Sequence, residues 1–246
     1  MEPLPAVRAV RAAFELLVPQ TCAGCLAPGT PCCARCRETL RCPRRLDSAN
    51  VTASPRTPVA TYALAEYRGV PRRLVLAYKD GGRRDLARVL GAEVARACLA
   101  LRVPQSGPLW LVPAPSRACA ARARGGQHML RVARAAARDL AVLGWHMGVA
   151  PPLRLASGAR DAVGLDRRQR VVNLSGRLRV ERRKLPPPGS AVVLVDDVIT
   201  TGATAATCVQ ALLRHDEYHP VVLAVTATGY ASGTLLRVVD PASASP

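Results

Sequence analysis

The sequence predicts an α/β fold, in which a mostly parallel sheet has flanking helices and a small cysteine-rich module precedes it. Short apolar runs are typical of strands that are buried on both faces, as in a parallel sheet. These runs are residues 59–65, 109–112, 192–195 and 220–227. Apolar residues at helical spacing predict helices over residues 67–79, 85–101, 126–143 and 205–214. The third observation is a cluster of six cysteines between residues 22 and 42, which marks the separate module.

Composition agrees with one α/β domain and a small appendage in 246 residues. Hydrophobic residues make up 49% of the chain, but aromatic residues only 3%, so the core must consist mainly of valine, leucine and alanine. The net charge of +18 permits an electrostatic hold on phosphates, from small ligands to nucleic acid. Lys79 and Lys184 are the only lysines, so a compositional preference for arginine is the competing explanation of this charge.

The sequence predicts no membrane span, because no segment approaches 18 uninterrupted apolar residues. Arg8, Arg11 and Glu15 interrupt the apolar stretch that a signal peptide would need near the N-terminus. We therefore expect a cytoplasmic protein whose cysteines are reduced.

Five segments are expected along the chain. Apolar residues at helical spacing predict an N-terminal helix within residues 1–20, and residues 21–45 form the cysteine motif. Residues 46–58 are polar and proline-bearing, as in a linker. The main domain is expected over residues 59–230 and a loose tail over residues 231–246.

Two Cys-x-x-Cys pairs in the second segment predict a structural zinc site. The four thiolates are those of Cys22, Cys25, Cys33 and Cys36, and together they complete a closed tetrahedral centre. Cys32 is the alternative to Cys33, which is preferred because it keeps the two-residue spacing. The segment is too short for a hydrophobic core, so the metal would supply its folding energy.

Residues 192–204 carry the main functional prediction. Four apolar residues are followed by the carboxylates Asp196 and Asp197, which can accept hydrogen bonds from sugar hydroxyls or hold water on Mg²⁺. A small turn then leads into a helix, where free backbone N–H groups and the helix dipole favour an anion. The turn residues are Thr200, Thr201, Gly202, Ala203 and Thr204. The alternative is an ordinary buried strand that ends in a capped helix.

A second turn follows the strand at residues 109–112. It begins with Pro113 and Ala114, and three arginines come after it: Arg117, Arg122 and Arg124. Guanidinium groups at the carboxyl end of a strand are suited to a pyrophosphate. A solvated start of a helix is the alternative. Lys79 is a further candidate to face a diphosphate.

The thirteen residues 192–204 resemble the 5-phosphoribosyl 1-diphosphate (PRPP) signature of type I phosphoribosyltransferases. Over nearly its whole length the chain resembles the ComF/GntX family. The further matching pieces are the four cysteines, Tyr67-Arg-Gly69 with Arg72, Leu74 and Lys79, Pro113-Ala-Pro115, Arg122-Ala-Arg-Gly125, and Gly164-Leu165 with Arg170 and Asn173. One departure is visible, because the family commonly continues Arg-Gly with Phe-Asn-Gln, whereas Gly126, Gln127 and His128 stand here.

The resemblance implies a type I phosphoribosyltransferase-like core with an N-terminal zinc ribbon or knuckle. In that fold the turn at residues 200–204 holds the ribose 5-phosphate of PRPP, and the acidic pair meets the ribose hydroxyls. The loop after Pro113 meets the pyrophosphate. We expect Mg²⁺-assisted transfer of phosphoribose to an acceptor that the sequence does not mark, with Asp196 and Asp197 as the catalytic residues.

Two alternatives to an enzyme stay open. One is a non-catalytic sensor of PRPP or a nucleotide. The other is an accessory protein for DNA uptake during natural transformation, which the resemblance implies for some members, with single-stranded DNA and a DNA-uptake helicase as partners. The chain has few aromatic side chains for a base-stacking platform, namely Phe14, Trp110, Trp145 and five tyrosines.

Overall fold

The structure, a computed structural model, describes residues 20–46, 52–54, 57–101, 108–116, 126–156, 174, 176–215, 218–230 and 234–235. Its centre is a seven-stranded sheet in the order β11-β1-β4-β10-β9-β5-β6. The strands are β1 (Arg44–Leu46), β4 (Thr61–Glu66), β5 (Leu109–Pro113), β6 (Met147–Val149), β9 (Ala191–Ile199), β10 (His219–Ala227) and β11 (Thr234–Leu235). The five strands from β4 to β6 are parallel, whereas β1 and β11 pair antiparallel at one edge. The predicted α/β class with a mostly parallel sheet is confirmed.

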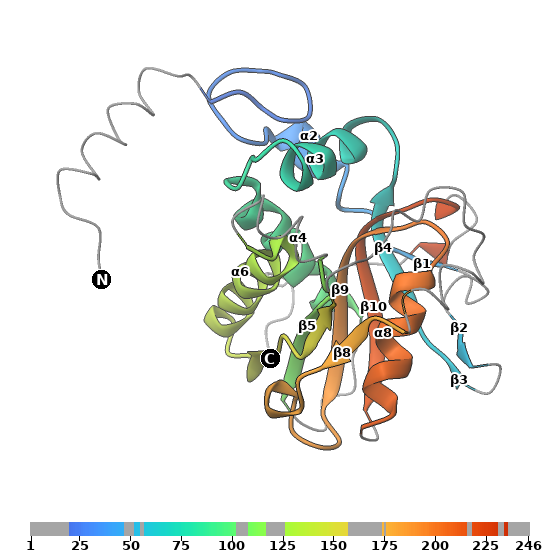
Figure 1. The fold of residues 1–246 in the computed structure, drawn as a ribbon. Helices are drawn as coiled ribbons and strands as arrows, with labels where there is room; N and C mark the ends of the chain where they lie inside the picture. Colours follow the sequence, from blue (N-terminus) through green and yellow to red (C-terminus); the bar gives the residue numbers. More distant parts are fainter. Residues whose placement is uncertain are drawn as a thin grey trace.

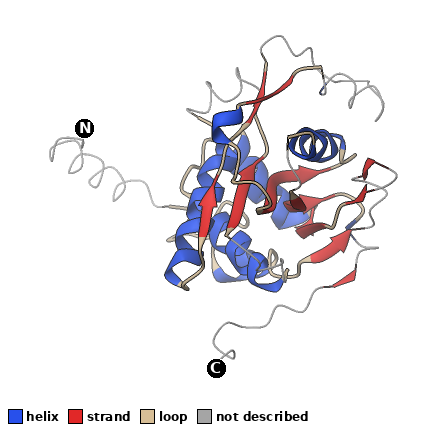
Figure 2. Ribbon diagram, turned by 90° about the horizontal axis from the view of Figure 1, so that it is seen from below, coloured by secondary structure: helices blue, strands red, loops and turns tan. Residues whose placement is uncertain are grey.

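Helices cover both faces of this sheet (Figures 1 and 2). One face carries α3 (Gly69–Lys79), α4 (Leu86–Ala100) and α6 (His128–Val142), and the other carries α8 (Ala203–Leu213). The residues of β9 alternate between the two layers, since Val193 and Val195 pack with the first three helices and Val192 and Leu194 with α8. All four side chains are fully buried. Each contributes about 1.5–3 kcal/mol of transfer free energy, which makes β9 the centre of the core.

The cysteine module packs on α3 and α4. Its short helix α2 (Ala34–Glu38) lies next to α3 in Figure 1. Glu93 of α4 is buried, and its carboxylate accepts hydrogen bonds from Arg37, from Arg41 at 3.3 Å and from Arg96 at 3.2 Å. Two of these arginines belong to the module, so the buried charge of Glu93 ties it to the main domain. Removing one partner of such a buried ion pair is strongly destabilising.

A further link joins the module to α3. The Arg73 Nε donates to the backbone oxygen of Gly24 at 2.6 Å, and Arg83, just after α3, donates to the backbone oxygen of Thr21 at 2.9 Å. A Cβ at Gly24 would lie 2.7 Å from the Cys36 Sγ and 2.9 Å from a methyl group of Val70, so only glycine fits between the module and the helix. The module is therefore held by the amino-terminal half of α3 and by the turn that follows the helix.

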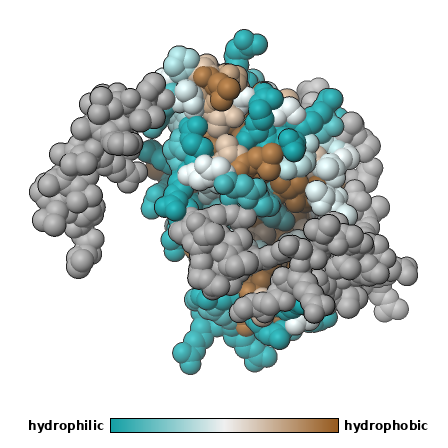
Figure 3. All heavy atoms as spheres, turned by 45° about the horizontal axis from the view of Figure 1, so that its top comes forward, coloured by the Kyte–Doolittle hydropathy of each residue, from teal (hydrophilic) through white to brown (hydrophobic). Residues whose placement is uncertain are grey.

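Two small two-stranded antiparallel sheets complete the described chain. One pairs β2 (Thr52–Ser54) with β3 (Thr57–Pro58), and the other pairs β7 (Leu153–Leu155) with β8 (Leu178–Val180). The 3₁₀ helix η2 (Arg182–Lys184) follows β8. No helix among these described segments is long and apolar enough to cross a membrane. Figure 3 shows mainly hydrophilic side chains around smaller apolar areas on the face that it presents.

The segment boundaries differ from the expected ones at both edges of the domain. The sequence places residues 44 and 45 in the cysteine motif and residue 46 in a linker, but all three form β1 and pair with β4. Residues 234 and 235 fall in the expected loose tail, yet they form β11 and pair with β1. The expected N-terminal helix lies almost wholly outside the described residues. The two strands at this edge of the sheet, β1 and β11, thus come from segments whose sequences do not predict strands.

Candidate functional site

The acidic pair lies inside β9, near its carboxyl end, and not after it as expected. Because successive side chains of a strand point to opposite faces, Asp197 follows Val193 and Val195 toward α3 and α6, and Asp196 faces α8. Both carboxylates are buried, each with a relative exposure of 7%. The two residues therefore meet different surroundings, although they are neighbours in sequence.

Asp197 is bound by two side chains from the helices on its face. Its Oδ2 lies 2.6 Å from the Lys79 Nζ at the end of α3 and 2.9 Å from the His128 Nε2 at the start of α6. Its Oδ1 accepts the backbone N–H of Val198 at 2.7 Å. Lys79, which the sequence suggests as a partner of a diphosphate, has its ammonium group on the carboxylate of Asp197 in the structure.

These contacts keep Asp197 ionised. Burial by itself would raise its pKa, but the hydrogen bond from His128 and the charge of Lys79 hold the pKa well below the usual range. Burial likewise works to lower the pKa of Lys79, and the charge of Asp197 outweighs it and raises that pKa. The carboxylate and the ammonium group therefore form a charged pair near the carboxyl end of β9.

Asp196 has the opposite behaviour. Its Oδ1 accepts the backbone N–H of Asp197 at 2.8 Å. Burial, and then the negative charge of Asp197, raise the pKa of Asp196 to about 7. Asp196 therefore changes its charge near neutral pH, whereas its neighbour does not. Perturbed carboxyl groups of this kind gather at functional sites.

The turn between β9 and α8 has the backbone geometry of an open helix start. Gly202 precedes the helix with φ of 70° and ψ of 1°, in the left-handed region that favours glycine. No side chain caps the helix, and the first helical hydrogen bond runs from the Ala206 N–H to the Gly202 oxygen at 2.9 Å. The N–H groups of the first turn are thus left for a ligand or water. Thr200 is exposed, and Thr201 and Thr204 are half-buried at this opening.

The turn after β5 lies beside the acidic strand. The Ala114 N–H donates to the Val195 oxygen at 2.9 Å, which continues the pairing of β5 with β9 past Pro113. Two residues on, the Ser116 Oγ lies 2.9 Å from the His128 Nδ1. The three arginines expected to meet a pyrophosphate, Arg117, Arg122 and Arg124, lie outside the described residues.

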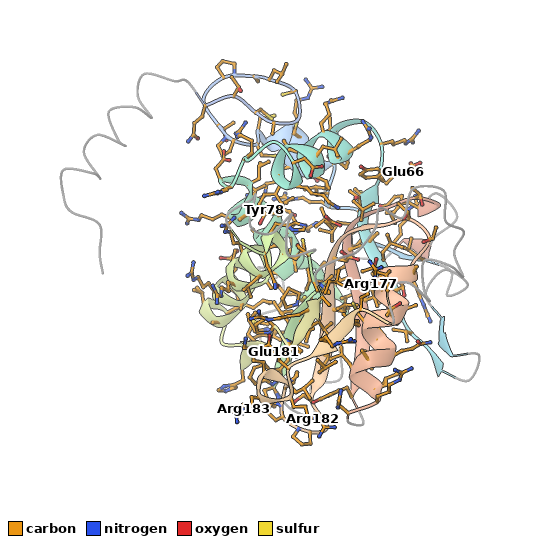
Figure 4. The ribbon with its side chains drawn as sticks, in the orientation of Figure 1. Glu66, Tyr78, Arg177, Glu181, Arg182 and Arg183 are labelled. Carbon is orange, nitrogen blue, oxygen red and sulfur yellow. The ribbon has the colours of Figure 1, made fainter. Side chains whose placement is uncertain are left out.

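Sequence reasoning missed His128, Ser116 and Tyr78 as parts of this site. The Tyr78 hydroxyl donates to the His128 backbone oxygen at 2.6 Å, and Figure 4 shows Tyr78 between α3 and the helices below it. Burial raises the pKa of Tyr78 to about 12, so it stays a neutral donor. In the sequence, the only signal for His128 was its place in the stretch after Arg-Gly that departs from the resembled pattern.

The thiol groups of Cys22, Cys25, Cys33 and Cys36 form one cluster, in which all four sulfur atoms lie within 4.8 Å of one another. The Cys22 Sγ accepts backbone N–H groups from Gly24 at 3.4 Å and from Cys33 at 3.3 Å. Burial opposes ionisation of Cys22, yet these N–H groups lower its pKa to about 6. The donor set therefore fits a metal ion such as zinc.

Cys32 lies outside this cluster. Its thiol contacts the backbone oxygen of Cys33 at 3.8 Å, and burial raises its pKa to about 12. The structure thus groups Cys33, and not Cys32, with the sulfur atoms of Cys22, Cys25 and Cys36. Cys42 is exposed and is not part of the cluster.

A cavity of about 190 Å³ lies between β8 and α8. Arg179, Gln210 and Arg214 are among its lining residues, and none of the predicted site residues is. Figure 4 shows Glu181, Arg182 and Arg183 near the same end of the molecule, far from Tyr78.

Comparison with known proteins finds similarity in structure but none in sequence. No protein-family model matches the sequence, and no curated protein matches it. The structure is similar to hypoxanthine phosphoribosyltransferase from Trypanosoma cruzi in complex with the product IMP, with a TM-score of 0.36 and 14% identity over 65% of this chain and 92% of that chain. For the Staphylococcus aureus enzyme the TM-score is 0.35, with 12% identity over 66% and 91%. Both likenesses are distant.

Proposed function

We propose that the chain binds PRPP at the carboxyl edge of β9 and transfers its phosphoribosyl group to an acceptor with the help of Mg²⁺. One observation carries this proposal: a buried strand with two carboxylates runs directly into an uncapped helix whose first residue follows a left-handed glycine. The N–H groups of residues 203–205 suit a phosphate, and a carboxylate suits ribose hydroxyls or the water shell of Mg²⁺.

The proposed reaction breaks the bond between ribose C1 and the diphosphate oxygen while the acceptor forms a bond to C1. Lys79 and the arginines at residues 117, 122 and 124 are assigned to the negative charge of the leaving diphosphate. The Lys79 ammonium group contacts Asp197 at 2.6 Å. To bind the diphosphate, it either leaves this carboxylate or contacts the carboxylate and the diphosphate together. Asp196 and Asp197 are assigned to the ribose and to Mg²⁺, and Mg²⁺, when bound, would neutralise diphosphate charge.

Finer assignments remain part of the proposal. They are membership of the ComF/GntX family, a cytoplasmic location, zinc as the ion held by the cysteine module at residues 21–45, and a phosphoribosyl site within residues 59–230. DNA uptake, with single-stranded DNA and a helicase as partners, is supported by the family resemblance and by the net charge of +18.

Calorimetric titration with PRPP and with ribose 5-phosphate tests the proposal. The Gly202→Val variant should bind neither ligand, because a branched side chain at a φ of 70° is strained and fills the approach to the helix N–H groups. Gly189→Val is the matched control, since Gly189 has a φ of 69° in a turn at the other end of β9. It should bind both ligands like the parent.

Failure of the parent to bind PRPP, or unchanged binding in folded Gly202→Val, would overturn the proposed function. Equal loss in both variants would also count against it, because backbone strain alone would then explain the result.

A further inference from the structure

Three side chains form a continuous hydrogen-bonded chain from the acidic strand to the edge of the site. Asp197 contacts His128 at 2.9 Å through Oδ2 and Nε2, and His128 contacts Ser116 at 2.9 Å through Nδ1 and Oγ. Asp197 and His128 are buried, with relative exposures of 7% and 6%, whereas Ser116 is half-buried. Ser116 is therefore the member of the chain that a ligand can reach.

The chemistry of the three groups sets the direction of the hydrogen bonds. An ionised carboxylate only accepts, so the proton between His128 and Asp197 belongs to the imidazole Nε2. In the neutral imidazole that carries its proton on Nε2, Nδ1 is an acceptor, and the Ser116 hydroxyl donates its proton to it. The lone pairs of the Ser116 oxygen then point away from His128. The hydrogen bond to His128 thus stops the Ser116 hydroxyl from rotating and leaves its oxygen free to accept a hydrogen bond from a ligand.

Ser116 lies where it could contact the end of a ligand opposite to a phosphate bound at residues 200–204. The turn at residues 200–204 opens α8 on one face of the sheet, whereas Lys79, His128 and Ser116 gather on the face that carries α3 and α6. The acidic pair lies between these two groups. A sugar phosphate whose phosphate is on the turn would extend its other end across Asp196 and Asp197 toward Ser116.

We propose that Ser116 is a further ligand-contacting residue of this site and that His128 is the residue that positions it. The outward oxygen of Ser116 accepts a hydrogen bond from a donor at the far end of the phosphorylated sugar. That donor is a sugar hydroxyl or a water molecule on the Mg²⁺ of a diphosphate. This inference rests on the proposed function and adds a contact that distinguishes the two ends of the ligand.

The contact is tested by calorimetry with Ser116→Ala and three ligands: PRPP with Mg²⁺, PRPP without Mg²⁺, and ribose 5-phosphate. Loss of one neutral hydrogen bond should weaken binding about two- to tenfold. Ser190→Ala is the matched control, because Ser190 lies at the opposite end of β9, where its hydroxyl donates to the Pro187 oxygen at 2.6 Å. This control should bind all three ligands like the parent.

The pattern of losses identifies the donor. A loss confined to PRPP with Mg²⁺ supports a metal-bound water, and an equal loss for ribose 5-phosphate supports a sugar hydroxyl. Unchanged binding of all three ligands by Ser116→Ala would overturn the inference while the proposed function stands. A parent that binds none of the ligands would instead overturn the proposed function.

The role of His128 needs a readout that a merely structural residue would not move. His128→Gln places an amide near the former Nε2, where it can still donate to Asp197, but it removes the acceptor for Ser116. It should therefore weaken the same ligand as Ser116→Ala, and the double variant should be no weaker than Ser116→Ala alone. His128→Asn, whose amide lies near the former Nδ1, should retain more of this binding. Additive losses in the folded double variant would contradict the positioning role.

Discussion

Asp196 and Asp197 show how a strand separates two adjacent residues of one type. Asp197 faces α3 and α6, where Lys79 and His128 favour its charged form. Asp196 faces α8, where burial and the charge of its neighbour disfavour ionisation and raise its pKa to about 7. The sequence predicted the pair as a unit, because the predicted strand ended at residue 195. Extending the two-residue alternation through Ile199 would have placed the carboxylates on opposite faces.

The raised pKa of Asp196 predicts a specific dependence of stability on pH. Asp196 binds its proton more tightly in the folded protein than in the unfolded chain, whose carboxyl has a pKa of about 3.8. The stability that it contributes is fully present below pH 4 and is lost as the pH rises through about 7. Asp196→Asn cannot ionise, so it should gain on the order of 2–4 kcal/mol relative to the parent between pH 4 and pH 8.

Urea unfolding of parent and variant at several pH values measures this difference. Parallel stability profiles across pH 4–8 would show that Asp196 does not bind its proton more tightly when folded.

At the scale of elements, the cysteine module is the clearest case of a fold that depends on something besides a core. Its short segment contributes few apolar side chains, and its four sulfur atoms lie together. Glu93, Arg73 and Arg83 then fix it to the main domain. The spacing of the cysteines was enough to predict the cluster. The contact partners were not predictable, because arginines that bind a buried carboxylate look like any others in this arginine-rich sequence.

We predict about one zinc per chain in the purified, reduced protein, as expected for four thiolates. A Cys22→Ser, Cys25→Ser double variant should lose this zinc and unfold more readily, because the metal supplies folding energy to the module. Cys42→Ser should keep the metal, since this exposed cysteine is outside the cluster. Metal analysis with thermal unfolding measures both effects, and a double variant with full zinc content would refute the assignment.

The other elements differ in how well the sequence predicts them. β9, β10, α4 and α6 have long apolar patterns, and the structure places each within a few residues of its predicted range. β1 and β6 are short, and β1 carries two arginines, so pairing with β4 and β5 decides their conformation rather than their own composition. His128 was missed for a similar reason. A histidine at a helix start is unremarkable until the fold brings β9 beside it.

At the scale of the whole molecule, the net charge of +18 concerns partners rather than the fold. We predict that binding of single-stranded DNA is mainly electrostatic, because arginines are abundant and aromatic side chains are few. Its affinity should then fall on the order of tenfold or more between about 50 and 200 mM salt.

Fluorescence anisotropy with two oligonucleotides of equal length and different sequence measures this dependence. The two affinities should fall together as salt rises. Salt-insensitive binding, or a strong preference for one oligonucleotide, would contradict an electrostatic mode.

The length of α3, eleven residues, limits which insertions and deletions the chain tolerates. Val70 and Arg73 contact the cysteine module near one end, and Lys79 reaches Asp197 from the other. The helix therefore fixes both the distance and the rotation about its axis between the cysteine module and Lys79. One inserted residue would lengthen it by about 1.5 Å and rotate Lys79 by about 100° relative to the module. Substitutions on its exposed side should accumulate freely, whereas insertions and deletions between residues 73 and 79 should not be tolerated.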